Sequence, residues 1–64
     1  MIAYYVESSS GWFIVNCKNA RQAKSEGVYE FGRGMVKNVR IATNDEIKYF
    51  KSVKGESAME PSIV

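Results

Sequence analysis

The fold is decided by residues 19–50, NARQAKSEGVYEFGRGMVKNVRIATNDEIKYF, which carry a helix, a strand and the start of a second helix. Asn19 is a good N-cap, because its side-chain oxygen can accept from the free amides of a first helical turn. Small and apolar residues then recur every three or four positions, which predicts a helix over residues 20–33. Because glycine in mid-helix costs about 1 kcal/mol relative to alanine, we interpret Gly27 as a position of close packing. The polar residues of this helix are expected to face water: Arg21, Gln22, Lys24, Ser25, Glu26 and Glu30.

The rest of this stretch predicts a strand and a second helix. Gly32 or Gly34 is expected to end the first helix, because either can adopt a left-handed conformation. Alternating apolar and polar residues then predict a strand over residues 35–42. Residues 43–46, Thr-Asn-Asp-Glu, form a capping box, so the second helix should start at about Asn44. Its apolar side is predicted to hold Ile47, Phe50 and Val53, its wet side Lys48, Lys51 and Lys54, and its end Gly55.

The residues before this stretch predict a β-hairpin. Residues 2–6 and 12–15 are β-branched and aromatic, and turn residues separate them. The prediction is therefore an α+β fold, a single small domain of residues 1–55 with the element order β-β-α-β-α. A helix between the second and third strands makes these parallel, with sheet order 2-1-3 or 1-2-3; we prefer 2-1-3. Both helices are expected on one sheet face, because no third amphipathic element is available to build a second apolar layer.

The end of the chain and its charge pattern differ from the rest. Residues 56–64, ESAMEPSIV, show no periodicity and contain the only proline, so we expect a flexible C-terminal tail. The net charge is +2, but all nine basic residues and only five of the seven acids lie in residues 1–55, which gives that part a net charge of +4. This is a mildly basic domain, weaker in charge than the clustered basic surfaces of most nucleic-acid-binding proteins.

Composition excludes several classes of function. The chain has no histidine and one cysteine, Cys17, so it has neither an internal disulfide nor a Cys/His set for zinc. No nucleophile has a candidate base, and we expect no enzymatic activity, no cofactor and no metal. We interpret Cys17 as a core side chain; a lone cysteine with no signal peptide ahead of it is typical of a cytoplasmic protein. The longest apolar run, residues 12–15, is far shorter than the ~20 residues needed to cross a bilayer, so no membrane partner is expected.

The predicted hairpin leaves one sheet face without cover. If Phe13, Val15 and Cys17 point inward, then Trp12 and Ile14 point outward, together with Tyr5 or Tyr4 depending on the register of the first strand. Such a patch favours a protein-binding surface, either for a partner protein or for a homodimer. The alternative is a nucleic-acid-binding face on which aromatic rings stack with bases. It is less favoured, because the lysines of the helices are expected on the opposite side. The predicted interaction surface is Tyr5, Trp12, Ile14, Arg33, Lys37 and Arg40.

Four segments resemble small uncharacterised proteins of bacteriophages and prophages. They are Trp12-Phe13-Ile14-Val15, Asn19-Ala20-Arg21-Gln22-Ala23-Lys24, residues 36–41, and Asp45-Glu46-Ile47. In those proteins a short strand precedes an A-x-x-A-K helix, a V-x-V/I strand and an acidic-capped helix. The resemblance implies a bacterial host cytoplasm and an accessory, host-modulating role. It implies no active-site residue.

Overall fold

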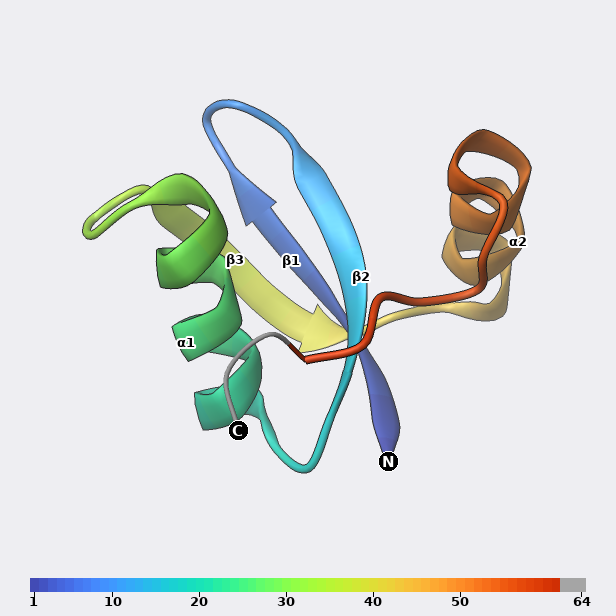
Figure 1. Cartoon of the computed structure of the whole chain (residues 1–64), viewed down its shortest axis with the longest axis horizontal. Coiled ribbons are helices and arrows are strands. Elements are labelled where there is room, and N and C mark those ends of the chain that lie inside the picture. Colours follow the sequence, from blue (N-terminus) through green and yellow to red (C-terminus); the bar gives the residue numbers. More distant parts are fainter. Residues whose placement is uncertain (62–64) are drawn as a thin grey trace.

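The chain folds into a three-stranded antiparallel sheet with a helix on either side (Figure 1). The computed structural model describes residues 1–61. Its elements are β1 (Ile2–Ser8), β2 (Trp12–Cys17), α1 (Ala20–Phe31), β3 (Val36–Ile41) and α2 (Asn44–Lys54). The sheet order is β2-β1-β3, and β1 runs antiparallel to both neighbours. The predicted α+β class, element order and preferred strand order are confirmed. Within the described residues, no helix combines the length and apolar character needed to span a membrane.

Both helices start at the side-chain caps that the sequence predicts. The Asn19 side chain accepts the Gln22 N–H at 2.9 Å and caps α1. At α2, the Thr43 hydroxyl accepts the Glu46 N–H, and the Glu46 carboxylate accepts the Thr43 N–H. Each cap satisfies backbone donors that have no partner inside the helix, so the start of each helix is set by residues a few positions apart.

The helix ends are set by glycines. α1 ends at Phe31, two residues before the predicted end, because the Gly32 N–H bonds to the Val28 carbonyl while Gly32 itself turns to φ 107°. α2 ends as predicted at Gly55, which adopts the left-handed conformation with φ 84° and ψ 0°. Positive φ costs little in glycine because it lacks a Cβ atom.

α1 packs closely on the sheet through a narrow stripe of small residues. Gly27 lies so close that an added Cβ would sit 2.7 Å from Val6 Cγ1 and 2.8 Å from Val36 Cγ2, which confirms it as a packing position. Glu26 is only 1% exposed, so the expectation that it faces water is wrong. It lies one turn after the buried Ala23, and the buried stripe is rotated toward this side of the helix.

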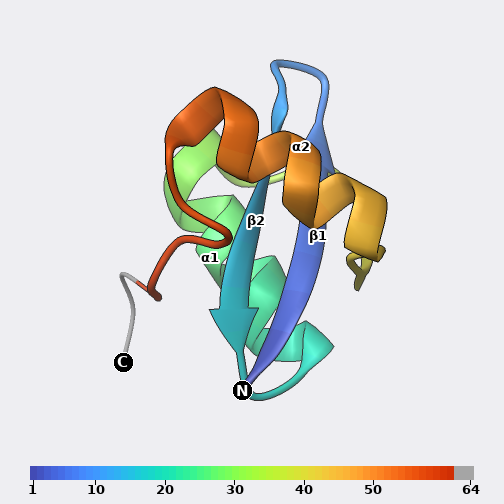
Figure 2. The ribbon, with the colours of Figure 1, turned by 90° about the vertical axis from the view of Figure 1, so that its right-hand side faces the viewer.

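α2 lies on the sheet face opposite α1, as Figures 1 and 2 show. Adjacent strand residues point to opposite faces, and Phe13 contacts Phe31 of α1 while its neighbour Trp12 contacts Phe50 of α2. The expectation that both helices cover one face is therefore wrong. The physical reason is that β2 is apolar on both faces: Ile14, expected to be exposed, is 0% exposed on the face that α2 covers.

The buried core thus occupies both sides of the sheet. Cys17 lies in it, which confirms its interpretation as a core side chain, and burial, aided by the nearby Glu26 carboxylate, raises the pKa of its thiol. The buried hydrophobic residues are Tyr4, Val6, Phe13, Ile14, Val15, Cys17, Ala23, Ala42 and Phe50.

The segment after Gly55 returns to the sheet and contacts the outer edge of β2. Met59 donates its N–H to the Ile14 carbonyl at 2.7 Å, and its own carbonyl accepts the Asn16 N–H at 2.9 Å. Flexibility of residues 56–64 stays a prediction, but the described part of the segment is held at Met59. The last three residues of the predicted tail, 62–64, lie outside the described residues.

Candidate functional site

An aromatic cluster joins β1, β2 and α2. Trp12 stacks against Tyr5 with 5.4 Å between ring centroids and against Tyr49 at 5.9 Å, and it meets Phe50 at 5.6 Å in a tilted arrangement. We call these four residues the Trp12 cluster. Stacked and edge-on ring pairs contribute about 0.5 to 1.5 kcal/mol each beyond the burial of their area. Trp12 is therefore held in place by its neighbours rather than projecting freely into water.

Arg40 of β3 links the Trp12 cluster to the start of α2. Its guanidinium carbon lies 4.3 Å from the centre of the Tyr5 ring, and its two terminal nitrogens donate to the two carboxylate oxygens of Glu46 at 2.8 and 2.5 Å. The hydrogen bond to Glu46 raises the pKa of Arg40. Burial, with the Glu7 carboxylate second, raises the pKa of the Tyr5 hydroxyl. Arg40 is thus paired, and its charge is largely compensated.

This network predicts a pH dependence of stability. The hydrogen bond from Arg40 lowers the pKa of the Glu46 carboxyl from 4.5 to about 2. Because the pKa of Glu46 is lower in the folded protein, ionised Glu46 stabilises the fold fully above about pH 4.5. This stabilisation is lost as the pH falls through about 2. Glu46→Gln, which keeps a capping oxygen, should lower stability at neutral pH, and the difference from wild type should shrink across that window. The effect should be modest, because both side chains are partly exposed and water screens the pair.

Urea unfolding at several pH values would measure this difference, and carboxyl NMR would follow Glu46 directly. In Arg40→Leu, Glu46 should titrate at a higher pH than in the wild type. A wild-type Glu46 that titrates near its ordinary value would contradict the pairing.

A groove lies between the β1–β2 turn and the outer flank of α2, next to the Trp12 cluster. Its volume is about 250 Å³, and two of its apolar residues, Tyr49 and Val53, are 60% and 59% exposed. The expectation that Val53 lies on the covered side of α2 is wrong, because most of its side chain is exposed. In this helix only Phe50 is fully buried. We call this the Val53 groove; it is lined by Gly11, Trp12, Tyr49, Phe50, Val53 and Lys54.

The structure brings together only part of the predicted interaction surface. Tyr5 and Trp12 lie in the Trp12 cluster, and Arg40 joins them through Tyr5. Tyr5 pairs directly with Ile14 in the sheet, so Tyr5 and not Tyr4 is the residue on that face. Ile14 is buried beneath α2 and cannot contact a partner.

The other two predicted residues lie apart from the Trp12 cluster. Arg33 is exposed in the turn between α1 and β3, and Lys37 is exposed on β3. Sequence reasoning missed Tyr49 and Val53 as exposed residues. Tyr49 falls outside the helical apolar stripe, and an aromatic residue on the wet side of a helix was the available signal.

The exposed lysines of α2 are also placed differently from the prediction. They were expected on the side of the molecule away from Trp12, but α2 covers the Trp12 face and carries them to the same side. That expectation is wrong because it depended on both helices lying on one face. These lysines are Lys48, Lys51 and Lys54.

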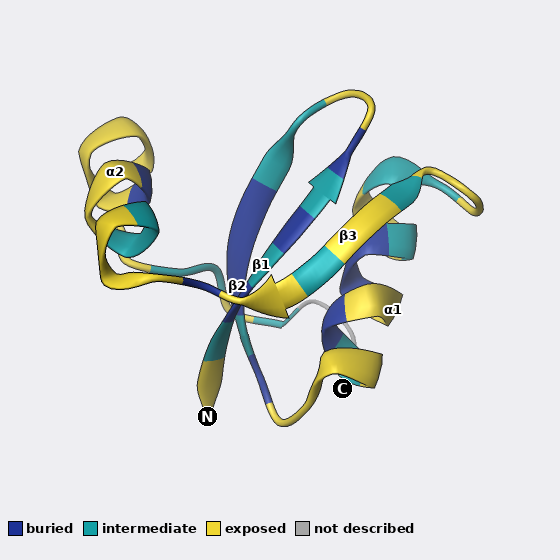
Figure 3. Ribbon diagram, turned by 180° about the vertical axis from the view of Figure 1, so that it is seen from behind, coloured by how far each residue is buried: buried dark blue, intermediate teal, exposed yellow. Residues whose placement is uncertain are grey.

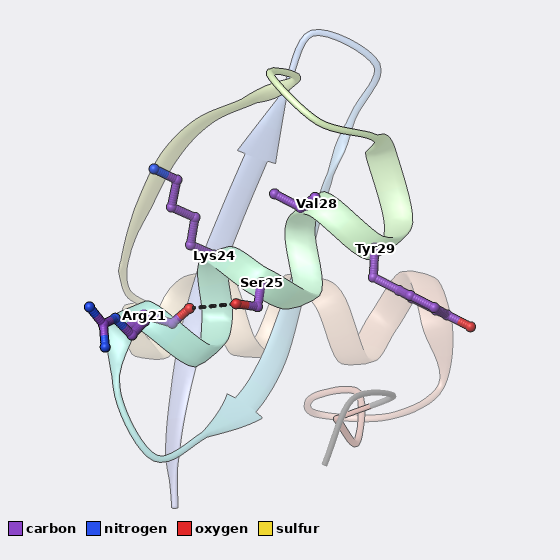
Figure 4. Close-up of a pocket in the computed structure, with 5 residues that line it drawn as sticks. All are labelled: Arg21, Lys24, Ser25, Val28 and Tyr29. Atoms are coloured by element: carbon purple, nitrogen blue, oxygen red, sulfur yellow. Dashed lines mark hydrogen bonds between the residues drawn. The ribbon is translucent and has the colours of Figure 1, made fainter.

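A larger hollow of about 470 Å³ follows the outer surface of α1 (Figure 4). Its described lining comes from this one helix: Arg21, Lys24, Ser25, Val28 and Tyr29. The Ser25 hydroxyl donates to the Arg21 carbonyl within the same helix. Among the described residues no second element forms an opposing wall, so the hollow presents the surface of a single helix and not a cleft between elements.

Comparison with protein-family models, with curated proteins and with solved structures found no match to this chain. Within residues 1–61, no three His, Cys, Asp or Glu side chains are grouped so that they could hold a metal ion. The function is therefore inferred from the surfaces described above.

Proposed function

We propose that this protein is a small, non-enzymatic protein-interaction module that binds a partner protein through the Val53 groove. One observation carries the proposal: Tyr49 and Val53 remain largely exposed beside the ordered ring of Trp12. Apolar side chains that stay exposed together beside a groove provide surface that a partner can bury, and aromatic residues in fixed positions are common anchors in contact sites. The groove would accept an apolar side chain of the partner, with Lys54 at its edge.

Binding to nucleic acid is the alternative, and the site supports it less well. Trp12 already stacks against Tyr5 and Tyr49, so its ring is not open to a base. Arg40 is engaged by Glu46 and is less available for a phosphate. The α2 lysines lie on the Trp12 side, which favours nucleic-acid binding. However, these lysines provide positive charge only, and the Trp12 ring beside them is not free to stack with a base.

The resemblance to small phage and prophage proteins suggests the setting of this interaction. It makes the partner a protein of a bacterial host cytoplasm and gives the module an accessory, host-modulating role. A second copy of the chain is the other candidate partner. Because α2 covers the sheet face, a homodimer on this side would form through the Val53 groove and the outer surface of α2.

Selection of binders from a displayed random-peptide library would test the groove. Selected peptides should bind wild type, and Val53→Asp should weaken binding at least about tenfold, equivalent to about 1.4 kcal/mol, because it places a charge in an apolar contact. Ser52→Asp is the matched control, since it adds the same charge at the neighbouring exposed position outside the groove. Trp12 is the only tryptophan and reports binding through its fluorescence. Peptides that bind Val53→Asp as well as wild type would contradict the proposal.

Two further measurements separate the partner classes. If sedimentation detects a dimer that Val53→Asp disrupts and Ser52→Asp does not, the partner is a second copy. Titration with fluorescent oligonucleotides at low and moderate salt addresses the alternative, because phosphate contacts weaken as salt rises. Salt-dependent oligonucleotide binding without any peptide binding would favour nucleic acid over protein.

A further inference from the structure

The two outer edges of the sheet differ. The edge of β2 is partly covered by Met59, which bonds to Ile14 and Asn16. The outer edge of β3 has no strand or segment bonded to it within residues 1–61. Figure 3, which views the molecule from behind, shows β3 nearest the viewer with nothing described in front of it. An uncovered edge of this kind is a template for pairing with another chain.

The backbone groups available on this edge follow from the pairing with β1. The Ala42 N–H donates to the Ala3 carbonyl at 2.9 Å. In an antiparallel ladder, bonded and non-bonded residues alternate, so Val39 and Ile41 direct their N–H and carbonyl groups away from β1. The strand therefore presents two donors and two acceptors with the spacing that an added strand requires. One of these acceptors, the Ile41 carbonyl, also accepts a long hydrogen bond of 3.4 Å from Arg40 Nη1, and its second lone pair remains for an added strand.

A groove of about 220 Å³ adjoins this edge where α1 meets β3. Its described lining consists of Lys24, Val36, Lys37, Asn38 and Val39. Val39 is half-buried and Ile41 is 61% exposed, and both lie on the sheet face that α1 covers, because they pair with Val6 and Tyr4. An extended peptide beside β3 would place every second side chain against this apolar surface.

The charge around the edge selects among possible occupants. Lys24 and Lys37 line the groove, Arg33 is exposed in the turn before β3, and no acidic residue is among the described lining. Among residues 1–61, Arg40 is the nearby cation with a carboxylate partner, Glu46. A second copy of the chain would bring an equally basic edge, and like charges facing one another oppose pairing. An acidic strand has the complementary charge.

We propose that the β3 edge is a second interaction site, which binds an extended acidic segment of a partner protein by β-strand addition. Backbone hydrogen bonds to Val39 and Ile41 provide the pairing, and alternate apolar side chains of the segment cover Val36 and Val39. Carboxylates on the segment face Lys24 and Lys37. Main-chain pairing with side-chain selection in an adjoining groove is an established mode of peptide recognition. This site is separate from the Val53 groove and does not depend on it.

The test uses a fluorescein-labelled peptide of alternating glutamate and valine, long enough to pair along β3. It should bind wild type with an affinity that falls as salt rises, whereas the matching lysine–valine peptide should not bind. In ¹⁵N NMR, the amides of Val39 and Ile41 should shift, and their hydrogen exchange should slow on binding. Unchanged Val39 and Ile41 amides, or equal binding of the lysine–valine peptide, would overturn the proposal.

Variants at the edge separate charge from backbone pairing. Lys24→Glu with Lys37→Glu should weaken binding at least about tenfold, while Lys48→Glu with Lys51→Glu makes the same change in net charge on α2 and should not. Val39→Pro removes the outward N–H that would bond to the peptide, without removing a bond to β1. Val39→Ala keeps this N–H and loses only the side chain, so it is the control for Val39→Pro. Peptide binding that survives in the double Lys24/Lys37 variant overturns the proposal. Sedimentation provides a second check. If wild type forms a dimer and the double Lys24/Lys37 variant changes its dimerisation, the occupant of the edge is a second copy of the chain, and the proposal of an acidic segment is overturned.

Discussion

Phe50→Ala is expected to lower the free energy of unfolding by about 3 to 5 kcal/mol, the usual range for removing a buried phenylalanine. Phe50 is 1% exposed, is the only fully buried residue of α2 and contacts Trp12. A single core in a chain of this size rarely provides more than about 3 to 5 kcal/mol in total. The variant should therefore be largely unfolded at room temperature, as measured by far-ultraviolet circular dichroism and urea titration.

Two control variants show whether this loss arises from the buried ring. Phe50→Leu keeps most of the apolar volume and should cost less than half as much. Val53→Ala, at an exposed position three residues further along α2, should change stability little. If Phe50→Ala costs less than about 1 kcal/mol, α2 is not anchored by this side chain, and the arrangement of the Trp12 cluster is wrong.

Gly27→Val is expected to cost about 3 kcal/mol, at the upper end of the range for overpacking. Even the first added carbon would lie 2.7 Å from Val6 and 2.8 Å from Val36, both of which are short and stiff at χ1. α1 would have to move away from the sheet to relieve these contacts. Gly27→Ala should cost less. Alanine has a better helix propensity than glycine by about 1 kcal/mol, and this gain offsets part of the cost of the close contacts with Val6 and Val36. Urea unfolding followed by Trp12 fluorescence would measure both.

The control for Gly27 is Ser25→Val, which introduces the same β-branched residue at an exposed position of the same helix. It isolates the effect of helix propensity from that of the close contact. Val36→Ala should partly rescue Gly27→Ala, because it removes one of the two opposing side chains. An equal loss of stability in Gly27→Val and Ser25→Val would show that α1 does not approach the sheet closely at this position.

The features predicted correctly from the sequence depend on residues close together in the chain. The Asn19 cap and the Thr43–Glu46 capping box each act within three residues, so the helix starts were predictable. Gly27 was interpretable because a mid-helix glycine needs a packing reason. For the strand order, the connection rules left 2-1-3 and 1-2-3 open, and the preferred 2-1-3, in which β3 pairs antiparallel with β1, is the order observed.

The candidate site was predicted less well, because it depends on which sheet face α2 covers. The periodicity of residues 44–54 identifies an apolar side but does not say which surface that side meets. The prediction placed Ile14 in water and the α2 lysines away from Trp12, and both errors follow from that one choice. The exposed groove at Val53 could not be identified before α2 was placed.

The helices and strands of this protein and their caps could be read from the sequence alone, because short-range hydrogen bonds and periodicity encode them. For the strand order, the connection rules left two possibilities. The folded structure was needed to place the two helices on opposite faces and to bury Glu26 and Ile14. It also shows that Met59 covers one sheet edge while no segment within residues 1–61 bonds to the outer edge of β3. These features depend on how the elements pack together, and that packing is driven by the burial of apolar area over the whole domain. Residues far apart in the chain contribute to that sum, and no local pattern records its outcome.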